Sequence, residues 1–184
     1  EVWTFGTAGS PHPLALGSVY VYDQLNRIRN SHSFDNLDLG NNLWPTTVPS
    51  NTIYGSTYTY DANGNILTLD RYDETGSLHF DQLQYGYHTE SGKLIRNRLY
   101  HVDDAGTNLT TGEDITDDVS TFETNPLLVT TANNYGYDAI GNLERDTKEE
   151  IQNIEWNVAG KISKITRTAT STKTNLEFDY NATG

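Results

Sequence analysis

The sequence predicts an all-β protein built as an array of antiparallel β-hairpins. The first observation is a seven-residue motif that recurs along the chain: an aromatic residue, Asp or Asn, two variable residues, Gly or Asn, one variable residue, and Ile or Leu. The second is the abundance of strand-favouring residues, including 12 Tyr among 184 residues. The third is that no window sustains the apolar period of an amphipathic helix. We therefore expect short strands joined by tight turns.

The motif copies set the order of the expected hairpins. Complete copies run over residues 22–28, 60–66, 72–78, 137–143 and 156–162, a looser copy with one extra residue runs over 87–94, and a further copy starts at residue 180. Residues 1–18 are a lead-in that can contain a strand, and residues 19–184 are the repeat array, with irregular insertions at about 35–55 and 106–134. Because the sequence has no Met and stops inside a copy, we expect it to be part of a longer chain.

Each copy has the chemistry of a three-residue hairpin loop, a type I turn followed by one left-handed residue. In residues 61–65, the Asp61 carboxylate can accept a backbone N–H two residues later and so hold the turn. Gly64 takes the positive φ without steric cost, and Asn26 is the next-best residue for that conformation in the first copy. The substitutions between copies therefore preserve one loop geometry.

The motif also predicts which side chains meet across a hairpin. If Asp61 and Asn65 close the loop, Tyr60 lies opposite Ile66. The same spacing pairs Tyr22 with Ile28, Tyr72 with Leu78, Tyr137 with Leu143 and Trp156 with Ile162. The aromatic residues two positions upstream, on the same face, are Tyr20, Tyr58, Tyr85, Tyr135 and Phe178. Only stacking on a neighbouring hairpin can bury such a stripe, so we expect free edges of the array to associate or to be covered by the insertions.

We assign the motif residues an architectural role. These structural repeat residues are Tyr22, Asp23, Asn26, Tyr60, Asp61, Gly64, Tyr72, Asp73, Gly76, Tyr87, Gly92, Tyr137, Asp138, Gly141, Trp156, Asn157, Gly160, Tyr180, Asn181 and Gly184.

Composition excludes several classes of function. The net charge of -13 leaves no basic surface for nucleic acid. Without Cys, the chain has no disulfide, no thiolate nucleophile and no cysteine metal site. No apolar run is long enough to span a membrane.

No catalytic, cofactor or metal site is predicted. The five His lack paired metal spacing, and the acidic segment 113–118 lacks the residue order of a calcium loop. Asp103 and Asp104 are strand neighbours that point to opposite faces, which argues against an acid–base pair. Trp3 and Trp44 are the candidate ligand contacts, because exposed aromatic rings stack on sugars and on partner proteins.

The copies resemble the YD-repeat, or Rhs, family, whose pattern is Tyr-x-Tyr-Asp-x-x-Gly-Asn/Arg-Leu. Residues 58–66 and 135–143 match this pattern closely, and residues 20–28 match it except for Asn26 in place of Gly. The resemblance implies a strip of hairpins that forms a curved, spiralling sheet, a segment of a hollow shell. In bacterial Rhs proteins and toxin-complex C components such shells enclose a C-terminal toxin, and in teneurins a related shell serves cell adhesion. The family's self-cleaving core segment has no match here.

Two functions follow as expectations. The first is a noncatalytic structural segment of a secreted or cell-surface protein, whose partner is the remainder of its own polypeptide, including a C-terminal toxin or effector domain. The second is an extracellular adhesion module that binds carbohydrate or a surface protein through exposed aromatic residues.

Overall fold

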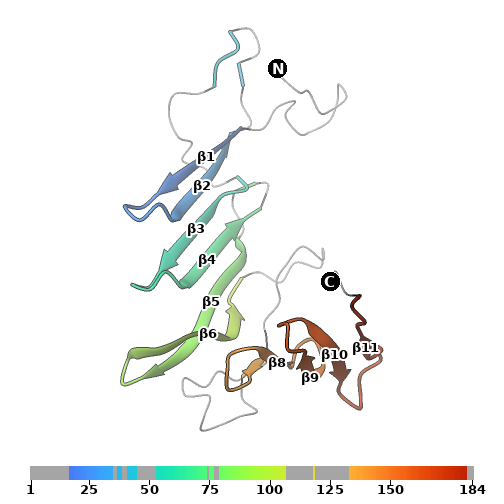
Figure 1. Cartoon of the computed structure of the whole chain (residues 1–184). Coiled ribbons are helices and arrows are strands. Elements are labelled where there is room, and N and C mark those ends of the chain that lie inside the picture. The colour runs from blue at the N-terminus through green and yellow to red at the C-terminus, as the bar shows by residue number, and fades with distance from the viewer. Residues whose placement is uncertain are drawn as a thin grey trace. The chain divides into compact units, whose positions relative to one another are not determined.

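The computed structural model describes residues 17–34, 37–38, 41–44, 53–73, 75–76, 79–106, 118 and 133–181. These residues form strands and turns, with no helix among them (Figure 1). The strands are β1 (Gly17–Tyr22), β2 (Ile28–Phe34), β3 (Ser56–Tyr60), β4 (Ile66–Tyr72), β5 (His79–Glu90), β6 (Lys93–Asp104), β7 (Tyr135–Tyr137), β8 (Leu143–Asp146), β9 (Ile151–Trp156), β10 (Ile162–Arg167) and β11 (Leu176–Glu177). The described part of the chain is therefore all-β, which confirms the predicted class.

The strands form two antiparallel sheets in which each strand neighbours the next one along the chain. One sheet contains β1 to β6 in sequence order, and the other contains β7 to β11 in sequence order. Consecutive pairing is what a series of hairpins produces, because each turn returns the chain beside the preceding strand. The chain also divides into two compact units, residues 1–84 with 104–115 and residues 85–103 with 116–184.

In the first unit, polar pairs join one hairpin to the next. Asn30 in β2 lies opposite Thr57 in β3, and its Nδ2 donates to the Thr57 hydroxyl at 3.2 Å. Arg71 in β4 lies opposite Asp81 in β5, and the fully buried Asp81 carboxylate forms an ion pair with the Arg71 guanidinium. Leu83, which is 1% exposed, is buried two residues further along β5. These pairs fix the register of successive hairpins.

In the second unit, the centre is aromatic. Tyr100, Val102 and Ile154 are buried, and so is His88. The Tyr100 ring meets the Tyr137 ring edge-on, with 5.4 Å between ring centroids. This contact connects the distal part of the β5–β6 hairpin to β7 within the same unit.

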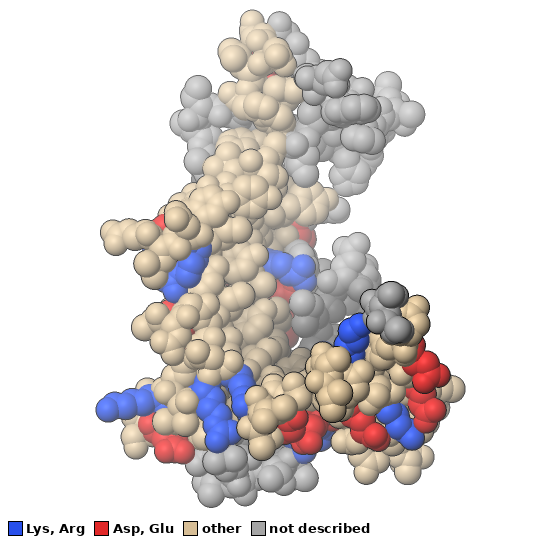
Figure 2. Space-filling view, viewed as in Figure 1, with Lys and Arg blue, Asp and Glu red and all other residues tan. Residues whose placement is uncertain are grey.

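The visible faces of the two sheets differ in their distribution of charge (Figure 2). In the view of Figure 2, uncharged side chains dominate the face of the first two hairpins, whereas acidic and basic side chains are interspersed over the C-terminal sheet.

Among the described residues, the buried hydrophobic side chains are Phe34, Leu83, Tyr100, Val102 and Ile154. A core this small agrees with a chain of which only 35% is hydrophobic. The hairpins therefore depend heavily on hydrogen bonds and ring contacts between neighbours.

The pairing predicted for the copy at residues 72–78 is wrong. Tyr72 lies opposite His79 rather than Leu78, and the two ring centroids are 4.1 Å apart. The turn itself forms, because Gly76 has a φ of +68° and donates its N–H to the Asp73 carbonyl at 3.1 Å. The ion pair between Arg71 and the buried Asp81 carboxylate favours this register, because a buried carboxylate that lost its partner would be strongly destabilising.

The looser copy at residues 87–94 also differs from the prediction. β5 and β6 are joined by Ser91 and Gly92, with φ of +49° and +73°, which is the signature of a two-residue type I′ turn. Gly92 does occupy a position of positive φ, but Tyr87 lies inside β5 and does not flank the loop. The two-residue turn permits strands of 12 residues on each side.

The two insertions lie mostly outside the described residues, as do Trp3 and Gly184. In the first insertion, Asp38 and Leu43 form an isolated antiparallel bridge. In the second, Asp118 donates its N–H to the Val102 carbonyl at 3.1 Å and accepts the Val102 N–H on Oδ2 at 2.8 Å. Asp118 thus satisfies both backbone groups of one residue on β6, an outer strand of its sheet, as expected of an insertion that covers an edge.

Because Leu83 is almost fully enclosed, Leu83→Ala should lower the free energy of unfolding by about 2–5 kcal/mol through lost burial and a residual cavity. Leu25→Ala is the matched control, since Leu25 is 67% exposed in a turn. Urea denaturation followed by tyrosine fluorescence measures both. Equal effects of the two substitutions would show that Leu83 is not part of a packed core.

Candidate functional site

The motif turn is a self-contained network of hydrogen bonds around one carboxylate. At residues 61–65, the Asp61 N–H donates to the Asn65 carbonyl at 3.0 Å, and the Gly64 N–H donates to the Asp61 carbonyl at 3.2 Å. The Asp61 carboxylate accepts the N–H groups of Asn63 and Asn65 at 2.9 and 2.8 Å and the Asn65 side-chain amide at 2.7 Å. Gly64 has a φ of +92°, so the loop is the predicted type I turn followed by a left-handed residue.

The same network recurs in three other copies. One side-chain oxygen of the motif residue after the aromatic accepts two backbone N–H groups at Asp23 and Asn157 and three at Asp138. Positive φ occurs at Asn26, Gly141 and Gly160. The aromatic lies opposite the final aliphatic residue in the pairs Tyr22–Ile28, Tyr60–Ile66, Tyr137–Leu143 and Trp156–Ile162. One loop geometry is therefore built from several side-chain combinations.

These hydrogen bonds change the acidity of the turn carboxylates. At Asp23, the backbone N–H of Arg27 is the main cause that lowers the pKa below its ordinary value of 3.8. At Asp61 and Asp138, desolvation raises the pKa, but the hydrogen bonds from the turn together outweigh it, so the pKa is lowered there too. The ionised form of each turn is thus the stable form at neutral pH.

A second set of bonds joins four of the motif aromatics to the hairpin before them, whereas no such bond of Tyr72 is seen among the described residues. The polar hydrogen of the motif aromatic is donated to a main-chain carbonyl of the preceding hairpin. The donors and acceptors are Tyr60 Oη to Ile28 O at 2.7 Å, Tyr137 Oη to Leu99 O at 2.7 Å, Trp156 Nε1 to Leu143 O at 2.8 Å and Tyr180 Oη to Ile162 O at 2.7 Å. The acceptors Ile28, Leu143 and Ile162 are themselves the final residues of their motif copies. We call this contact the interhairpin latch.

Where the latch residue is Tyr, a cation from the preceding hairpin lies over its ring. Arg27 Cζ is 4.6 Å from the Tyr60 ring centroid, and the Arg27 Nη1 donates to the Asp61 carbonyl at 3.0 Å. Arg98 stands in the same relation to Tyr137, with Cζ at 5.6 Å and a bond of 3.3 Å to the Asp138 carbonyl.

Lys161 completes the set, with its Nζ 4.9 Å from the Tyr180 ring centroid. Each of these cations directly precedes the residue whose carbonyl accepts the tyrosine hydroxyl. Each latch tyrosine therefore contacts a basic–aliphatic dipeptide of the preceding hairpin.

Two of the latch tyrosines, Tyr60 and Tyr137, have raised pKa values and so remain protonated donors at neutral pH. Desolvation, reinforced by the neighbouring Tyr100, raises the pKa of Tyr137 to about 12, and Arg98 only partly opposes this shift. Desolvation is also the first cause that raises the pKa of Tyr60. A phenol that holds its proton can donate to a carbonyl, as the geometry requires.

Of the two candidate ligand contacts, Trp44 and Trp3, the structure describes Trp44. Trp44 is 39% exposed, and its ring packs edge-on against Phe34 at 6.3 Å between centroids. A Cβ on Gly17 would lie 3.1 Å from the same indole. Trp3 lies outside the described residues.

Two acidic residues from the segments rejected as catalytic or calcium sites hold backbone in place. Asp104 accepts the N–H groups of Gln82 and Gly106 at 2.7 and 2.8 Å. Asp118, from the acidic segment 113–118, is bonded to Val102 as described above, and burial raises its pKa. In the described parts of the chain, no group of three or more His, Cys, Asp or Glu could hold a metal ion. No helix among those residues could cross a membrane.

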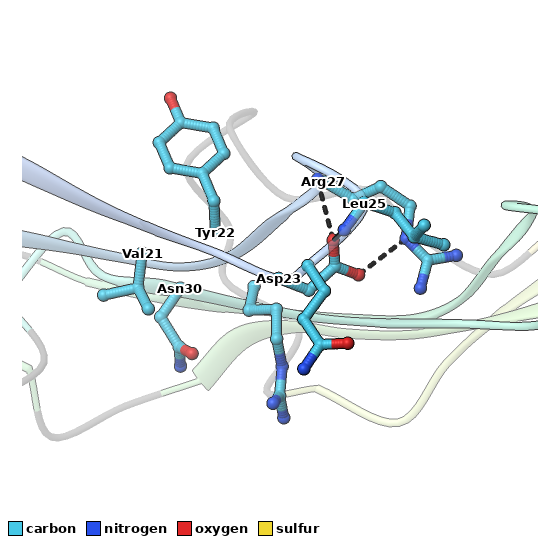
Figure 3. Close-up of a pocket in the computed structure, with 8 residues that line it drawn as sticks. Val21, Tyr22, Asp23, Leu25, Arg27 and Asn30 are labelled. Atoms are coloured by element: carbon cyan, nitrogen blue, oxygen red, sulfur yellow. Dashed lines mark hydrogen bonds and ion pairs between the residues drawn. The ribbon is translucent and has the colours of Figure 1, made fainter.

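An open hollow of about 530 Å³ lies at the first hairpin. Its lining includes Val21, Tyr22, Asp23, Leu25, Arg27 and Asn30. Figure 3 shows the Asp23 carboxylate bonded to Arg27, while the Tyr22 ring projects away from that pair. Asp23 Oδ2 and Arg27 Nε are 2.7 Å apart, so these two groups neutralise each other, while Arg29 adds a further positive charge to the lining.

No known family model matches the chain, and no curated protein matches it significantly. The interhairpin latch is therefore described from its own geometry. The sequence did not reveal it directly, although one signal was present: a basic residue precedes the final aliphatic residue in the copies at 22–28 and 156–162.

Replacing Tyr60 by Phe should lower the free energy of unfolding by about 0.5–1.5 kcal/mol, because the Ile28 carbonyl loses its donor. Tyr58→Phe is the matched control, since Tyr58 stacks on Tyr60 at 6.4 Å on the same strand but no hydrogen bond of its hydroxyl is seen in the described part of the chain. Urea denaturation compares the two. A loss for Tyr58→Phe as large as that for Tyr60→Phe would contradict the latch.

Asp61→Asn should be tolerated, because Asn157 forms the same backbone bonds, but it should be less stable than the wild type at pH 6. Depressed pKa values stabilise the fold above the ordinary pKa of 3.8, and that stability is lost as the pH falls through the folded-state pKa. The stability gap between wild type and variant should therefore close below about pH 4. Denaturation curves between pH 6 and 2.5 measure it, and a gap that stays constant over this range would exclude the ionised turn as its cause.

Proposed function

We propose that this chain is a noncatalytic structural segment of a secreted or cell-surface protein of the YD-repeat (Rhs) type. In this proposal it forms part of a curved β-wall that encloses or presents a C-terminal toxin or effector domain of the same polypeptide. The observation that carries the proposal is the interhairpin latch, which recurs at four junctions between neighbouring hairpins.

The latch supports a scaffold because it consumes the groups that a binding site would need. A ring that binds a sugar or a partner must offer a free face and an available polar atom. The Tyr60 and Tyr137 rings carry Arg27 and Arg98 on a face, and their hydroxyls are bonded to main-chain carbonyls. The most conspicuous residues of the motif are thus used for joining hairpins.

Carbohydrate binding is the second candidate, and one observation favours it. Tyr20 and Tyr22 on β1 are 53% and 54% exposed and lie two residues apart, so they share a face of the strand. Trp44, the expected contact for such a ligand, instead packs on Phe34. The exposed pair alone makes a smaller platform than the aromatic stripe that the motif suggested.

A glycan array separates the two candidates. For a scaffold we expect no binding above background. Selective binding to one glycan class that is removed by Tyr20→Ala or Tyr22→Ala would replace the scaffold with an adhesion module.

A second measurement tests the wall itself in the polypeptide that carries this chain. We expect the domain enclosed by the repeats to resist trypsin. The double variant Tyr60→Phe/Tyr137→Phe loses two hydrogen bonds, and each loss should increase the cleavage rate of the enclosed domain by about fivefold or more. The control is Tyr58→Phe. Cleavage of the enclosed domain at the same rate in wild type and in the double variant would argue against a closed wall.

A further inference from the structure

We propose that the outer edge of β1 is a docking surface for a further β-hairpin, one whose second strand begins with a basic–aliphatic dipeptide. The docking surface consists of Tyr20, Tyr22 and the main-chain carbonyl of Asp23. The proposal rests on the scaffold function above and adds the chemistry by which a partner would be recognised.

Tyr22 occupies the latch position of the first copy, but no latch partner for it is found in the described residues. The corresponding residues Tyr60, Tyr137 and Tyr180 each donate to a carbonyl of the preceding hairpin. Tyr22 is 54% exposed, and it projects away from its own turn (Figure 3). β1 is also the first strand of its sheet, so one of its two edges faces no described strand.

The three tyrosine latches define what would fit there. In each, the incoming residues are a cation over the ring and, directly after it, an aliphatic residue whose carbonyl accepts the hydroxyl: Arg27–Ile28, Arg98–Leu99 and Lys161–Ile162. The latch at Trp156 differs, because Asn142 precedes its acceptor Leu143. Since the first copy carries a tyrosine, the partner should bring a cation.

The main-chain carbonyl of Asp23 is the acceptor that the docking surface offers to an incoming cation. In the second copy, the Asp61 carbonyl accepts the Gly64 N–H and the Arg27 guanidinium together. The Asp23 carbonyl accepts the Asn26 N–H at 3.1 Å and retains a second lone pair for a guanidinium. Exposed Val19 and Val21 on the same strand supply apolar surface for a neighbouring strand.

The undescribed residues of this chain cannot complete a latch of this kind at Tyr22. All 12 Lys and Arg of the sequence lie in the described parts, so none of the undescribed segments can provide the cation.

A second copy of the chain fits poorly. Its spare basic–aliphatic dipeptide after a turn is Lys93–Leu94, where Lys93 is exposed. Only a few residues further along β6, Arg98 and Leu99 already hold the Tyr137 hairpin. Because Arg98 and Leu99 are occupied, too little of the outer edge of β6 remains free to pair with the whole of β1. The partner is therefore a hairpin of the same motif type from outside these 184 residues.

The test uses a synthetic peptide that copies residues 151–167, whose second strand begins with Lys161–Ile162, and titrates it into the whole chain. NMR shifts should report saturable binding at β1. Tyr22→Phe should weaken binding about fivefold, the effect of one lost hydrogen bond, while Tyr58→Phe should not. A peptide with Lys161→Asn should bind about two- to fivefold more weakly, because it lacks the cation.

Isolated hairpins fold only marginally, so a second format links the same hairpin ahead of residue 1 through a flexible linker. Hydrogen exchange should then show added protection of those β1 amides that do not bond to β2, and less protection with Lys161→Asn in the added hairpin.

Three results would overturn the proposal. They are the same affinity for Tyr22→Phe and wild type, no added protection of β1 in the linked format, and sedimentation showing a dimer of the chain that Tyr22→Phe abolishes. None of these depends on the latch at Tyr60. If Tyr60→Phe leaves stability unchanged, the scaffold function fails independently of the β1 surface.

Discussion

The structure depends on one constraint: a short hairpin cannot bury its own aromatic residue or satisfy that residue's polar hydrogen. The motif places a Tyr or Trp at the end of each first strand, and the hairpin alone offers it only an aliphatic neighbour. The preceding hairpin supplies the missing carbonyl, and often a cation. Where a latch is present, a hairpin is therefore completed by its predecessor, which makes stability there a property of neighbouring pairs.

The charges of the chain follow from the same architecture. The sequence is strongly acidic, with 25 Asp and Glu against 12 Lys and Arg. Several acidic residues hold turns, where the ionised carboxylate accepts backbone N–H groups. Several cations lie at junctions or in ion pairs, such as Arg27 over Tyr60 and Arg71 with Asp81. Many charged groups that look available for chemistry in the sequence are engaged in holding the backbone.

Local features were predictable from the sequence because their determinants lie within seven residues. The loop at Asp61, the positive φ at Gly64 and the pairing of Tyr60 with Ile66 all follow from the residues of one copy. The prediction failed at Tyr72, where the ion pair of a distant residue, Asp81, favours a different register. It failed again at Tyr87, because Ser91 and Gly92 adopt a two-residue turn in which both have positive φ.

The sequence by itself determined the strand class and the position and geometry of the turns at Asp23, Asp61, Asp138 and Asn157, since each rests on contacts between residues close in the chain. Only the tertiary structure decided which carbonyl each aromatic reaches. The latch joins residues such as Tyr60 and Ile28, which are 32 positions apart, and the distance between successive copies varies with the insertions. No fixed spacing in the sequence predicts such a contact. The contact forms because two hairpins lie side by side, and the order of residues within either hairpin does not determine it.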